Sequence, residues 1–528
     1  MVALRAPAPR GAQPAAVRPA RRVACRRMVA AAVARPLEAA PRRPHVVVAG
    51  GGIGGLMSAL ALARRGLSVE VMEKVQEYKP FGGPIQLQCN ALATLETIDP
   101  GLAAKVIEQG TVTGDRLNGL LDGVNGEWYL KFDTRAPCRK NGLPLAIVIS
   151  RYALLDLLRQ AVEDAGVTVR TGATVVSYEE SRERTAGGAP APLEAVLECG
   201  ERVACDVLVG ADGIRSRVRA HMRGGEDPEK PFKYAGYAVY TAVCDYTAIH
   251  TDTDQVGYQV FLGANQYFVS SDVGNGQQQY YAFLKVPDGA SDRWARCEEW
   301  DNYRDMLIDR FQGWSPAVLE RLHCTRPEDV ERRDVNDLAP DPRWVDGRVA
   351  LLGDACHAVQ PNLGQGGGQA IESSFALADE LALLPTDRAW TEAEVRDALN
   401  RYAGRRFLRA AAVHGLSRMA SAMNNVYRSH LGADPYEWYP EPVRKFFTWL
   451  GQYNIPHPGR CVGQVMMMLT MPMILEYVGS GMGLPDWLGG ASVGQRVPYC
   501  QVPGVGAPKR NRLREESFAM RGLPGFAD

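Results

Sequence analysis

Residues 45–74 read HVVVAGGGIGGLMSALALARRGLSVEVMEK, and this stretch decides the fold. Residues 46–49 are an apolar run typical of a buried strand, residues 56–65 are rich in Ala and Leu and favour a helix, and residues 67–72 predict a second strand. Five of the six residues at 50–55 are glycine, which costs backbone entropy unless something must approach the main chain closely. The stretch therefore predicts a strand, a tight glycine turn, a helix and a second strand.

The glycines fit the pattern GxGxxG at Gly50, Gly52 and Gly55, with Ile53 inside it. In such a turn the first glycine makes the bend, the second lets a pyrophosphate approach the helix N-terminus, and the third lets the helix pack on the strand. Glu73 follows Gly50 by 73 − 50 = 23 residues, where a carboxylate accepts the ribose hydroxyls of an adenine dinucleotide. The alternative is a tight turn in an ordinary strand–helix–strand unit, and the acid after the second strand favours a dinucleotide.

The composition is that of a globular chain with a basic leader. A length of 528 residues with 46% apolar content exceeds one ordinary domain. Residues 1–44 hold ten Arg, no Lys and one acid, Glu38, which is typical of an organelle transit peptide; a basic tail that stays attached is the alternative. The remainder carries 60 − 10 = 50 basic and 60 − 1 = 59 acidic residues, and this acidic balance argues against nucleic acid as a partner.

The pattern changes after residue 230. Strand-like runs at 167–176 and 203–209 and a helix beginning near Arg151 continue the first pattern, whereas residues 234–286 hold short runs rich in Tyr, Phe and Val that predict an antiparallel sheet. The fold class is therefore α/β, a Rossmann-like FAD-binding domain with an inserted mixed or antiparallel β-sheet substrate domain and a C-terminal helical region. The predicted parts are a transit peptide at 1–44, the FAD-binding domain at 45–230 and 330–390, the substrate domain at 231–329, the helical region at 391–480 and a tail at 481–528.

Two later motifs repeat the combination of a strand end, glycine and an acid. CDVLVGADGIRSRVR at 205–219 places Asp212 after a strand, and GDACHAVQPNLGQGG at 353–367 places Asp354 after another. Ligands of open α/β sheets bind at such carboxyl ends. Asp354 is placed to bind a polyol chain, and the glycines at 364–368 open a helix whose amides stabilise negative charge. A flavin meets both demands, because it has a ribityl chain and a ring that becomes anionic on reduction. A loop turn is the alternative for each motif taken alone.

These motifs, with Arg151 in SRYALLDLL between them, resemble the single-component flavoprotein monooxygenases from about residue 45 to 430. Segments outside the flavin motifs, among them GGPIQLQCNALATLETID and IPHPGR, are similar to the zeaxanthin epoxidases of plants and algae as far as about residue 480. Two departures stand out. Nothing after residue 500 matches the forkhead-associated domain of plant forms, and Lys79, Pro80 and Phe81 replace the glutamate and arginine commonly found before GPIQ.

The resemblance implies an FAD-dependent monooxygenase that epoxidises the β-rings of zeaxanthin, giving antheraxanthin and violaxanthin, through a flavin C4a-hydroperoxide. It implies molecular oxygen as co-substrate and a chloroplast location at the stromal periphery of the thylakoid membrane. Electrons are expected from reduced ferredoxin or NAD(P)H, docking transiently because the sequence has no second GxGxxG. Since an alkene has no proton to lose, no catalytic side chain is assigned, and no metal is expected. The alternatives are an aromatic-ring hydroxylase of the same family and a non-catalytic flavin- or carotenoid-binding paralogue.

The roles carried over by the resemblance concern the cofactor. Arg151 is expected to face the FAD phosphates, Val175 to touch the adenine through its backbone, and the residues at 364–366 to face the pyrimidine end of the ring. His357 is interpreted as a hydrogen-bonded structural residue rather than an acid–base group. The expected cofactor-binding residues are Gly50, Gly52, Ile53, Gly55, Glu73, Arg151, Val175, Asp212, Gly353, Asp354, Pro361, Gly364, Gln365 and Gly366.

A xanthophyll substrate dissolved in a membrane needs an apolar route and implies peripheral membrane contact. The aromatic strands at 237–284 and the Met-rich stretch VGQVMMMLTMPMILEYVG at 462–479 are the candidates. One Gln, one Pro and one Glu interrupt that stretch, which argues against a bilayer span, and packing in the interior is favoured over lying on a membrane. Changing Met467 and Met468 to Asp is therefore expected to reduce epoxidation more than FAD content.

Overall fold

The computed structural model describes residues 44–79, 83–132, 134–135, 138, 143–180, 193–228, 231–245, 256–286, 300–385, 388–428, 430, 439–453 and 455–480. All of them belong to the second of two compact units, residues 43–528. The predicted transit peptide apart from Pro44, the predicted tail, and both Pro80 and Phe81 lie outside the described residues.

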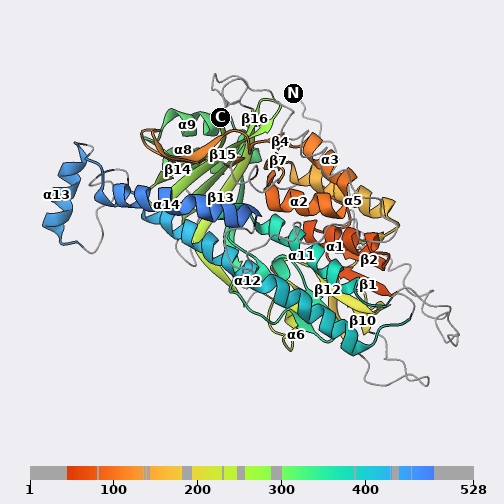
Figure 1. Cartoon of the computed structure of the whole chain (residues 1–528). Helices are drawn as coiled ribbons and strands as arrows, with labels where there is room; N and C mark the ends of the chain where they lie inside the picture. Colours follow the sequence, from red (N-terminus) through yellow and green to blue (C-terminus); the bar gives the residue numbers. More distant parts are fainter. Residues whose placement is uncertain are drawn as a thin grey trace, which may run out of the picture. The chain divides into compact units, whose positions relative to one another are not determined.

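The nucleotide-binding half is built on a six-stranded sheet with the strand order β18-β19-β12-β1-β2-β8. Strand β1 pairs in parallel with β2 and β12, and β12 pairs in parallel with β19, so the carboxyl ends of these strands share one edge. Figure 1 shows helices α1 and α11 beside this sheet, with α5 next to α1. The strands are β1 (His45–Ala49), β2 (Ser68–Glu73), β8 (Thr168–Thr171), β12 (Val207–Gly210), β18 (Val345–Asp346) and β19 (Val349–Leu351), and the helices are α1 (Ile53–Arg64), α5 (Arg151–Asp164) and α11 (Gly366–Leu381).

The first strand–helix–strand unit forms as its sequence predicts. Strand β1 is buried on both faces, which explains why its sequence is a continuous apolar run. The turn between β1 and α1 is so tight that a Cβ on Gly55 would overlap the carbonyl oxygen of Gly50. Gly50 itself has φ +107°, a conformation that only glycine adopts readily. The glycines at these two positions are therefore required by the fold.

The second half is a seven-stranded sheet with the order β17-β13-β16-β15-β14-β5-β6. Its pairs are antiparallel except β5 with β14, so the predicted antiparallel sheet is confirmed for β13–β16. The predicted limits of 231–329 are too narrow for this sheet, because β5 and β6 precede them and β17 follows them. The strands are β5 (Leu117–Asp122), β6 (Trp128–Phe132), β13 (Phe232–Asp245), β14 (Val256–Gly263), β15 (Gln266–Gly274), β16 (Gln277–Lys285) and β17 (Glu331–Leu338).

Two three-stranded sheets flank these layers, in the orders β11-β10-β9 and β3-β7-β4. The run at 167–176, expected as one strand, is divided between β8 and β9, and the run at 203–209 is divided between β11 and β12. In each case the two strands belong to different sheets. The bounds are β3 (Ile85–Leu87), β4 (Thr111–Val112), β7 (Ile147–Ile149), β9 (Val175–Glu180), β10 (Leu193–Leu197) and β11 (Arg202–Cys205).

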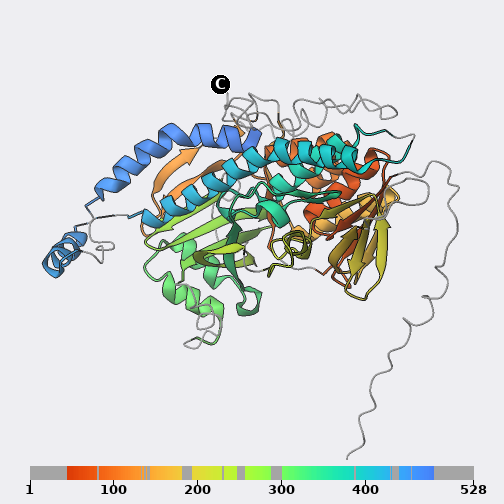
Figure 2. The same ribbon diagram turned by 90° about the horizontal axis from the view of Figure 1, so that it is seen from below.

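Long helices form the C-terminal region. Helix α12 (Glu392–Val426) starts at a capping box in which Thr391 and Glu394 satisfy each other's backbone amides, and it packs along α11. Figure 2 shows α12 and α14 (Pro458–Ser480) on the same side of the seven-stranded sheet. Helix α13 (Glu441–Gly451) buries none of its residues. The remaining helices are α2 (Cys89–Ile98), α3 (Pro100–Gln109), α6 (Arg217–Met222), α8 (Tyr303–Arg310), α9 (Pro316–His323), α10 (Asp354–His357) and the 3₁₀ turns η1 (Pro327–Asp329) and η2 (Pro361–Leu363).

Candidate functional site

The glycine turn meets Glu73 at the carboxyl edge of the six-stranded sheet. The Gly51 amide donates to one carboxylate oxygen of Glu73, and the Val75 amide donates to the other at 2.9 Å. A Cβ built on Gly52 would meet no atom within 4 Å, so there is room beside the main chain at this position. An open space next to the first turn of a helix is what a pyrophosphate requires.

Asp212 lies beside this turn, and one oxygen of its carboxylate is occupied by the protein's own main chain. A Cβ on Gly50 would come within 3.0 Å of the Asp212 Cα. The Asp212 carboxylate accepts hydrogen bonds from the amides of Arg217 at 2.8 Å and Val218 at 3.2 Å and so caps α6; burial raises its pKa, and these bonds offset only part of that effect. The buried Val175 begins β9, a strand of the three-stranded sheet β11-β10-β9. Val175 can offer a nucleotide only its main chain, whereas the Asp212 side chain still has one buried oxygen, Oδ1, without a hydrogen-bond partner among the described residues.

The charge of Arg151 acts on the Asp354 carboxyl although the two residues are 354 − 151 = 203 positions apart in the chain. Arg151 is the first residue of α5, and Asp354 follows Gly353, which has φ +65°. Solvent reaches the Asp354 side chain, yet protein surrounds it closely, and burial raises the pKa of its carboxyl while the positive charge of Arg151 partly opposes that rise.

The loop at 361–366 leads from η2 into α11. Gly364 is left-handed, with φ +62°, and a Cβ there would lie 3.0 Å from the Gln86 side-chain oxygen. The Gln365 side chain points inward and donates to Gln88 Oε1 at 2.7 Å. It is therefore not free to face a flavin ring, and only its main chain and that of Gly366 can do so. A Cβ on Gly366 would meet nothing within 4 Å, which leaves room for a ligand there.

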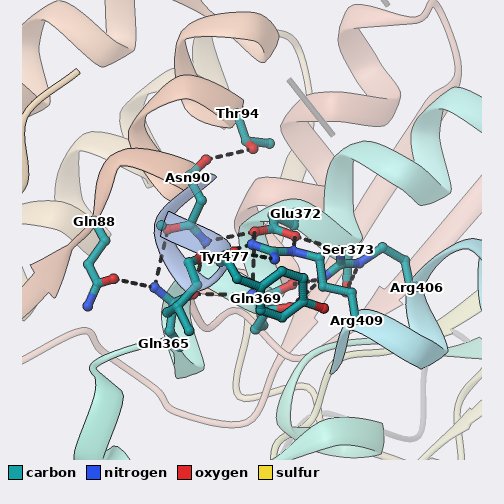
Figure 3. Close-up of polar contacts among 12 residues, drawn as sticks. Gln88, Asn90, Thr94, Gln365, Gln369, Glu372, Ser373, Arg406, Arg409 and Tyr477 are labelled. Atoms are coloured by element: carbon teal, nitrogen blue, oxygen red, sulfur yellow. Dashed lines mark hydrogen bonds and ion pairs between the residues drawn. The ribbon is translucent and has the colours of Figure 1, made fainter. Parts of the chain in front are cut away.

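Behind this loop lies a fully buried polar network, drawn in Figure 3. Asn90 at the start of α2 donates to Gln365 Oε1 at 2.9 Å and to Glu372 Oε1 at 2.7 Å. Glu372 also accepts hydrogen bonds from Arg406 Nη1 at 2.5 Å and from Arg409 Nε at 2.7 Å. Burial alone would raise the pKa of Glu372, but the two guanidinium groups outweigh it and lower that pKa to about 2. Glu372 is therefore an anion at neutral pH.

His357 is structural, in agreement with its interpretation from the sequence. Its Nε2 lies 3.0 Å from the Ser373 hydroxyl, and its ring packs against Trp344. Burial, together with the charge of Arg406, lowers the pKa of His357 to about 3. A neutral imidazole held between these groups has no proton to exchange near neutral pH.

A cavity of about 150 Å³ lies between the seven-stranded sheet and the helices α12 and α14. The loop at 361–366 is called the flavin loop below, after the cofactor that it is predicted to face. Part of the cavity wall belongs to this loop or contacts it, namely Gln86, Gln88, Asn362 and Leu363. No charged side chain is among the described residues that line it. The rest of the wall is largely apolar and includes Leu120, Phe132, Tyr258, Val260, Leu416, Met419, Met423, Met467, Met471, Ile474 and Leu475.

The two methionines that were expected to act alike have different surroundings. Met467 is 5% exposed and lines the cavity, whereas Met468 is 59% exposed. Interior packing is therefore the right interpretation for one face of α14 and the wrong one for the other. By length and composition alone α14 could cross a membrane, although it contains Pro472.

Comparison with known proteins identifies the family. The family described as FAD binding domain matches residues 43–415. The chain is 40% identical over 519 residues to the chloroplastic zeaxanthin epoxidase of Spinacia oleracea, covering 94% of this chain and 70% of that protein. It is 42% identical over 478 residues to that of Arabidopsis thaliana, covering 88% and 64%. The chain belongs to the zeaxanthin epoxidase family. It spans about two thirds of the length of these relatives.

Solved structures agree on the fold. Klebsiella pneumoniae HpxO complexed with FAD and uric acid aligns with a TM-score of 0.60 at 22% identity, covering 81% of this chain and 97% of that one. A salicylate hydroxylase substrate complex aligns with a TM-score of 0.60 at 20% identity, covering 84% and 99%. These likenesses confirm the predicted α/β fold class. Together with the family they make this zeaxanthin epoxidase relative an FAD-dependent monooxygenase, an enzyme that uses molecular oxygen, as the sequence predicted.

The network behind the flavin loop was not predicted from the sequence. A signal existed, since Gln86, Gln88 and Asn90 are polar at alternate positions within GGPIQLQCN, where a buried strand would be apolar. The pair Arg406 and Arg409 likewise follows helical spacing on one face of α12. Neither pattern indicates which residue the side chains bind, because Glu372, the carboxylate that joins the two groups, lies on a third segment.

Proposed function

We propose that this chain epoxidises the β-ring of zeaxanthin and closely related xanthophylls in the chloroplast, with FAD as its cofactor. The observation that carries this proposal is the uncharged and mainly apolar wall of the cavity, one end of which adjoins the flavin loop. A hydroxylase of an aromatic acid would need a cation for the substrate carboxylate, and no charged side chain is present among the described residues of this wall. An apolar ring with an alkene is the better match.

The arrangement of the predicted residues supports a site for FAD. The Gly50–Gly55 turn would hold the pyrophosphate, Glu73 the adenosine ribose, and Arg151 the phosphates, while Asp354 would hold the ribityl chain. The main chain at the start of α11 would face the pyrimidine end of the ring, where the positive end of the helix dipole stabilises negative charge. FAD, when bound and reduced, would supply the two electrons that activate O₂, so that one oxygen atom goes to the alkene and the other leaves as water.

The protein's part in the reaction is positioning and exclusion of water. The alkene gives up no proton, so the cavity needs no general base. Tyr258 stays protonated, because burial raises the pKa of its phenol. Met467 and Met471 lie one helical turn apart on α14, so both would contact the same side of a bound ring. Such a dry wall holds the ring in place and keeps water from the activated oxygen.

The substrate reaches the cavity from a membrane. Eleven large apolar residues on or between α13 and α14 are at least 36% exposed, which is unusual for a protein surface in water. Aromatic side chains of α13 stack on one another at this surface, Phe446 on Trp449 and Trp449 against Tyr453. Trp and Tyr favour the membrane interface, so α13 and the outer face of α14 would rest on the stromal side of the thylakoid membrane. The eleven are Val443, Phe446, Trp449, Tyr453, Ile455, Val462, Val465, Met466, Met468, Leu469 and Met473.

Turnover of purified protein tests the proposal. FAD-loaded protein is given zeaxanthin in vesicles of thylakoid lipid, oxygen, and either reduced ferredoxin or NADPH, and the pigments are separated by chromatography. We expect antheraxanthin and then violaxanthin with at least one of the two donors. Production of neither epoxide, together with a perturbed flavin spectrum on adding benzoates, would contradict the proposal and favour the aromatic-ring hydroxylase.

A further inference from the structure

The buried network behind the flavin loop carries more positive than negative charge. Glu372, Arg406 and Arg409 are each at most 2% exposed in their side chains, and two guanidinium groups share one carboxylate. A buried charge without compensation is costly. A further source of negative potential must therefore contact this cluster.

The last turn of α14 provides this negative potential through its carbonyl oxygens. Arg409 donates to the carbonyl oxygens of Tyr477 at 3.0 Å and Val478 at 3.1 Å, and the Cys89 thiol donates to that of Gly479 at 2.9 Å. The final carbonyls of a helix have no partner within the helix, and they form the negative end of its dipole, equivalent to about half an elementary charge. Arg409 and the end of α14 thus satisfy each other.

The same guanidinium is linked to the flavin loop through Glu372 and Asn90. Its Nε and Nη2 bond both oxygens of Glu372 at 2.7 Å each. Glu372 accepts from Asn90, which in turn donates to Gln365 at the start of α11. Figure 3 shows these side chains in continuous contact from Tyr477 to Gln365. One unbroken path of hydrogen bonds therefore joins the end of α14 to the loop.

Between its ends, α14 forms a wall of the cavity. At its start, the Gln464 amide donates to the Tyr129 carbonyl oxygen at 2.6 Å. The middle of the helix presents Met467, Met471 and Leu475 to the cavity, while its other face is exposed. With so little buried contact along its length, the position of this wall depends on how the two ends are held.

We propose that Arg409 and Glu372 are positioning residues that lock α14, the outer wall of the substrate cavity, to the flavin loop. Because one buried cluster sets both the wall and the loop, the substrate ring and the flavin are placed relative to each other by it. The identity of the ring rests on the function proposed above, whereas the lock itself does not. Loosening the lock lets oxygen be activated while the ring is out of place, and two electrons and two protons then leave with O₂ as hydrogen peroxide.

The variant Arg409→Lys tests the lock in the full-length, FAD-loaded protein. Lysine keeps the charge, but its single ammonium cannot bond Glu372 twice and reach two carbonyls of α14 as the planar guanidinium does. We expect amide exchange in the last turn of α14 to become roughly tenfold faster, as for the loss of one charge-assisted hydrogen bond. We also expect a larger share of donor electrons to be recovered as peroxide, with unchanged FAD content. The matched control is Arg401→Met on the same helix, which removes a half-exposed pair with Glu380 and should alter neither readout.

A second variant covers the case in which Arg409→Lys does not fold. Cys89→Ala removes the thiol donor to Gly479, together with the contact of that thiol with Cys138, and leaves every charge of the network in place, so it should speed exchange in the same turn by a smaller factor. Unchanged exchange in α14 in the variant that folds would overturn the proposal, and so would a loss of FAD in proportion to the rise in peroxide. If exchange responds as expected while the wild type leaves zeaxanthin unmodified, the proposed function fails and the lock stands.

Discussion

The glycine turn allows cofactor binding to be separated from folding with two alanine substitutions. In Gly55→Ala the new methyl would overlap the Gly50 carbonyl oxygen and stand 2.9 Å from its carbonyl carbon, so α1 must shift away from β1. In Gly52→Ala the methyl enters a space with no atom within 4 Å, at a φ of −76° that alanine adopts readily. The first change should damage the fold, and the second should damage the cofactor site alone.

The sizes of the two effects follow from these surroundings. Overpacking at Gly55 should lower the free energy of unfolding of the apoprotein by about 1–3 kcal/mol, or by more because the clash is with backbone. Gly52 precedes α1, and alanine is a poorer N-cap than glycine, so its cost to the apoprotein should stay below about 1 kcal/mol. If the open space receives the pyrophosphate, the methyl displaces it from the helix amides. The loss of one or two charge-assisted hydrogen bonds weakens FAD binding roughly 10- to 100-fold.

Two measurements decide the matter. Denaturant unfolding of the FAD-free protein gives the stability of each variant, and quenching of flavin fluorescence on titration with apoprotein gives the dissociation constant for FAD. Wild-type FAD affinity in Gly52→Ala would refute the assignment of this turn to the pyrophosphate. Wild-type stability of Gly55→Ala would show that the turn is looser than the structure describes.

Three further outcomes test the cavity, the exposed helix and the buried histidine. Met467→Asp puts a carboxylate into the uncharged wall and should lower kcat/KM for zeaxanthin roughly 100-fold at constant FAD content, whereas Met468→Asp, at a side chain 59% exposed, should leave turnover of detergent-dispersed substrate within about twofold. Trp449→Ser, which removes a ring 53% exposed, should reduce co-sedimentation with anionic lipid vesicles severalfold, and unchanged co-sedimentation would exclude α13 from the membrane contact. Burial and Arg406 lower the pKa of His357 from 6.5 to about 3, so between these two pH values the imidazole is protonated in the unfolded chain and neutral in the folded protein. The free energy of unfolding should therefore fall as the pH is lowered from 6.5 to 3, and this group contributes at most about 1.4 kcal/mol per pH unit to the fall. Denaturant titrations of His357→Gln should show a smaller decrease over the same pH range.

Local patterns predicted the local structure closely. The helix expected at 56–65 is Ile53–Arg64, and the strand expected at 67–72 is Ser68–Glu73, because glycine spacing and apolar runs act over a few residues. The placement of Asp212 and Asp354 after the neighbouring strands β12 and β19 was also predicted, since the carboxyl ends of parallel strands share an edge.

Strand pairing across the chain could not be read in the same way. The run at 203–209 is apolar except for Asp206, and this one residue separates two strands that belong to different sheets. Strands β5 and β6 join the distant sheet through a parallel pair with β14, and no periodicity reveals a partner more than one hundred residues away. The faces of α14 posed the same problem, because a helix rich in apolar residues all round does not indicate which face is covered.

The position of the cavity beside the flavin loop has a consequence for a substrate with two identical ends. Only part of the cavity wall adjoins that loop, so a long molecule can present one of its two rings to the loop at a time. A molecule modified at one end has to withdraw, reverse its direction and enter again before the other end can react. On the proposed function, the intermediate with a single oxygen would thus leave the cavity between the two steps, and other enzymes would have access to it.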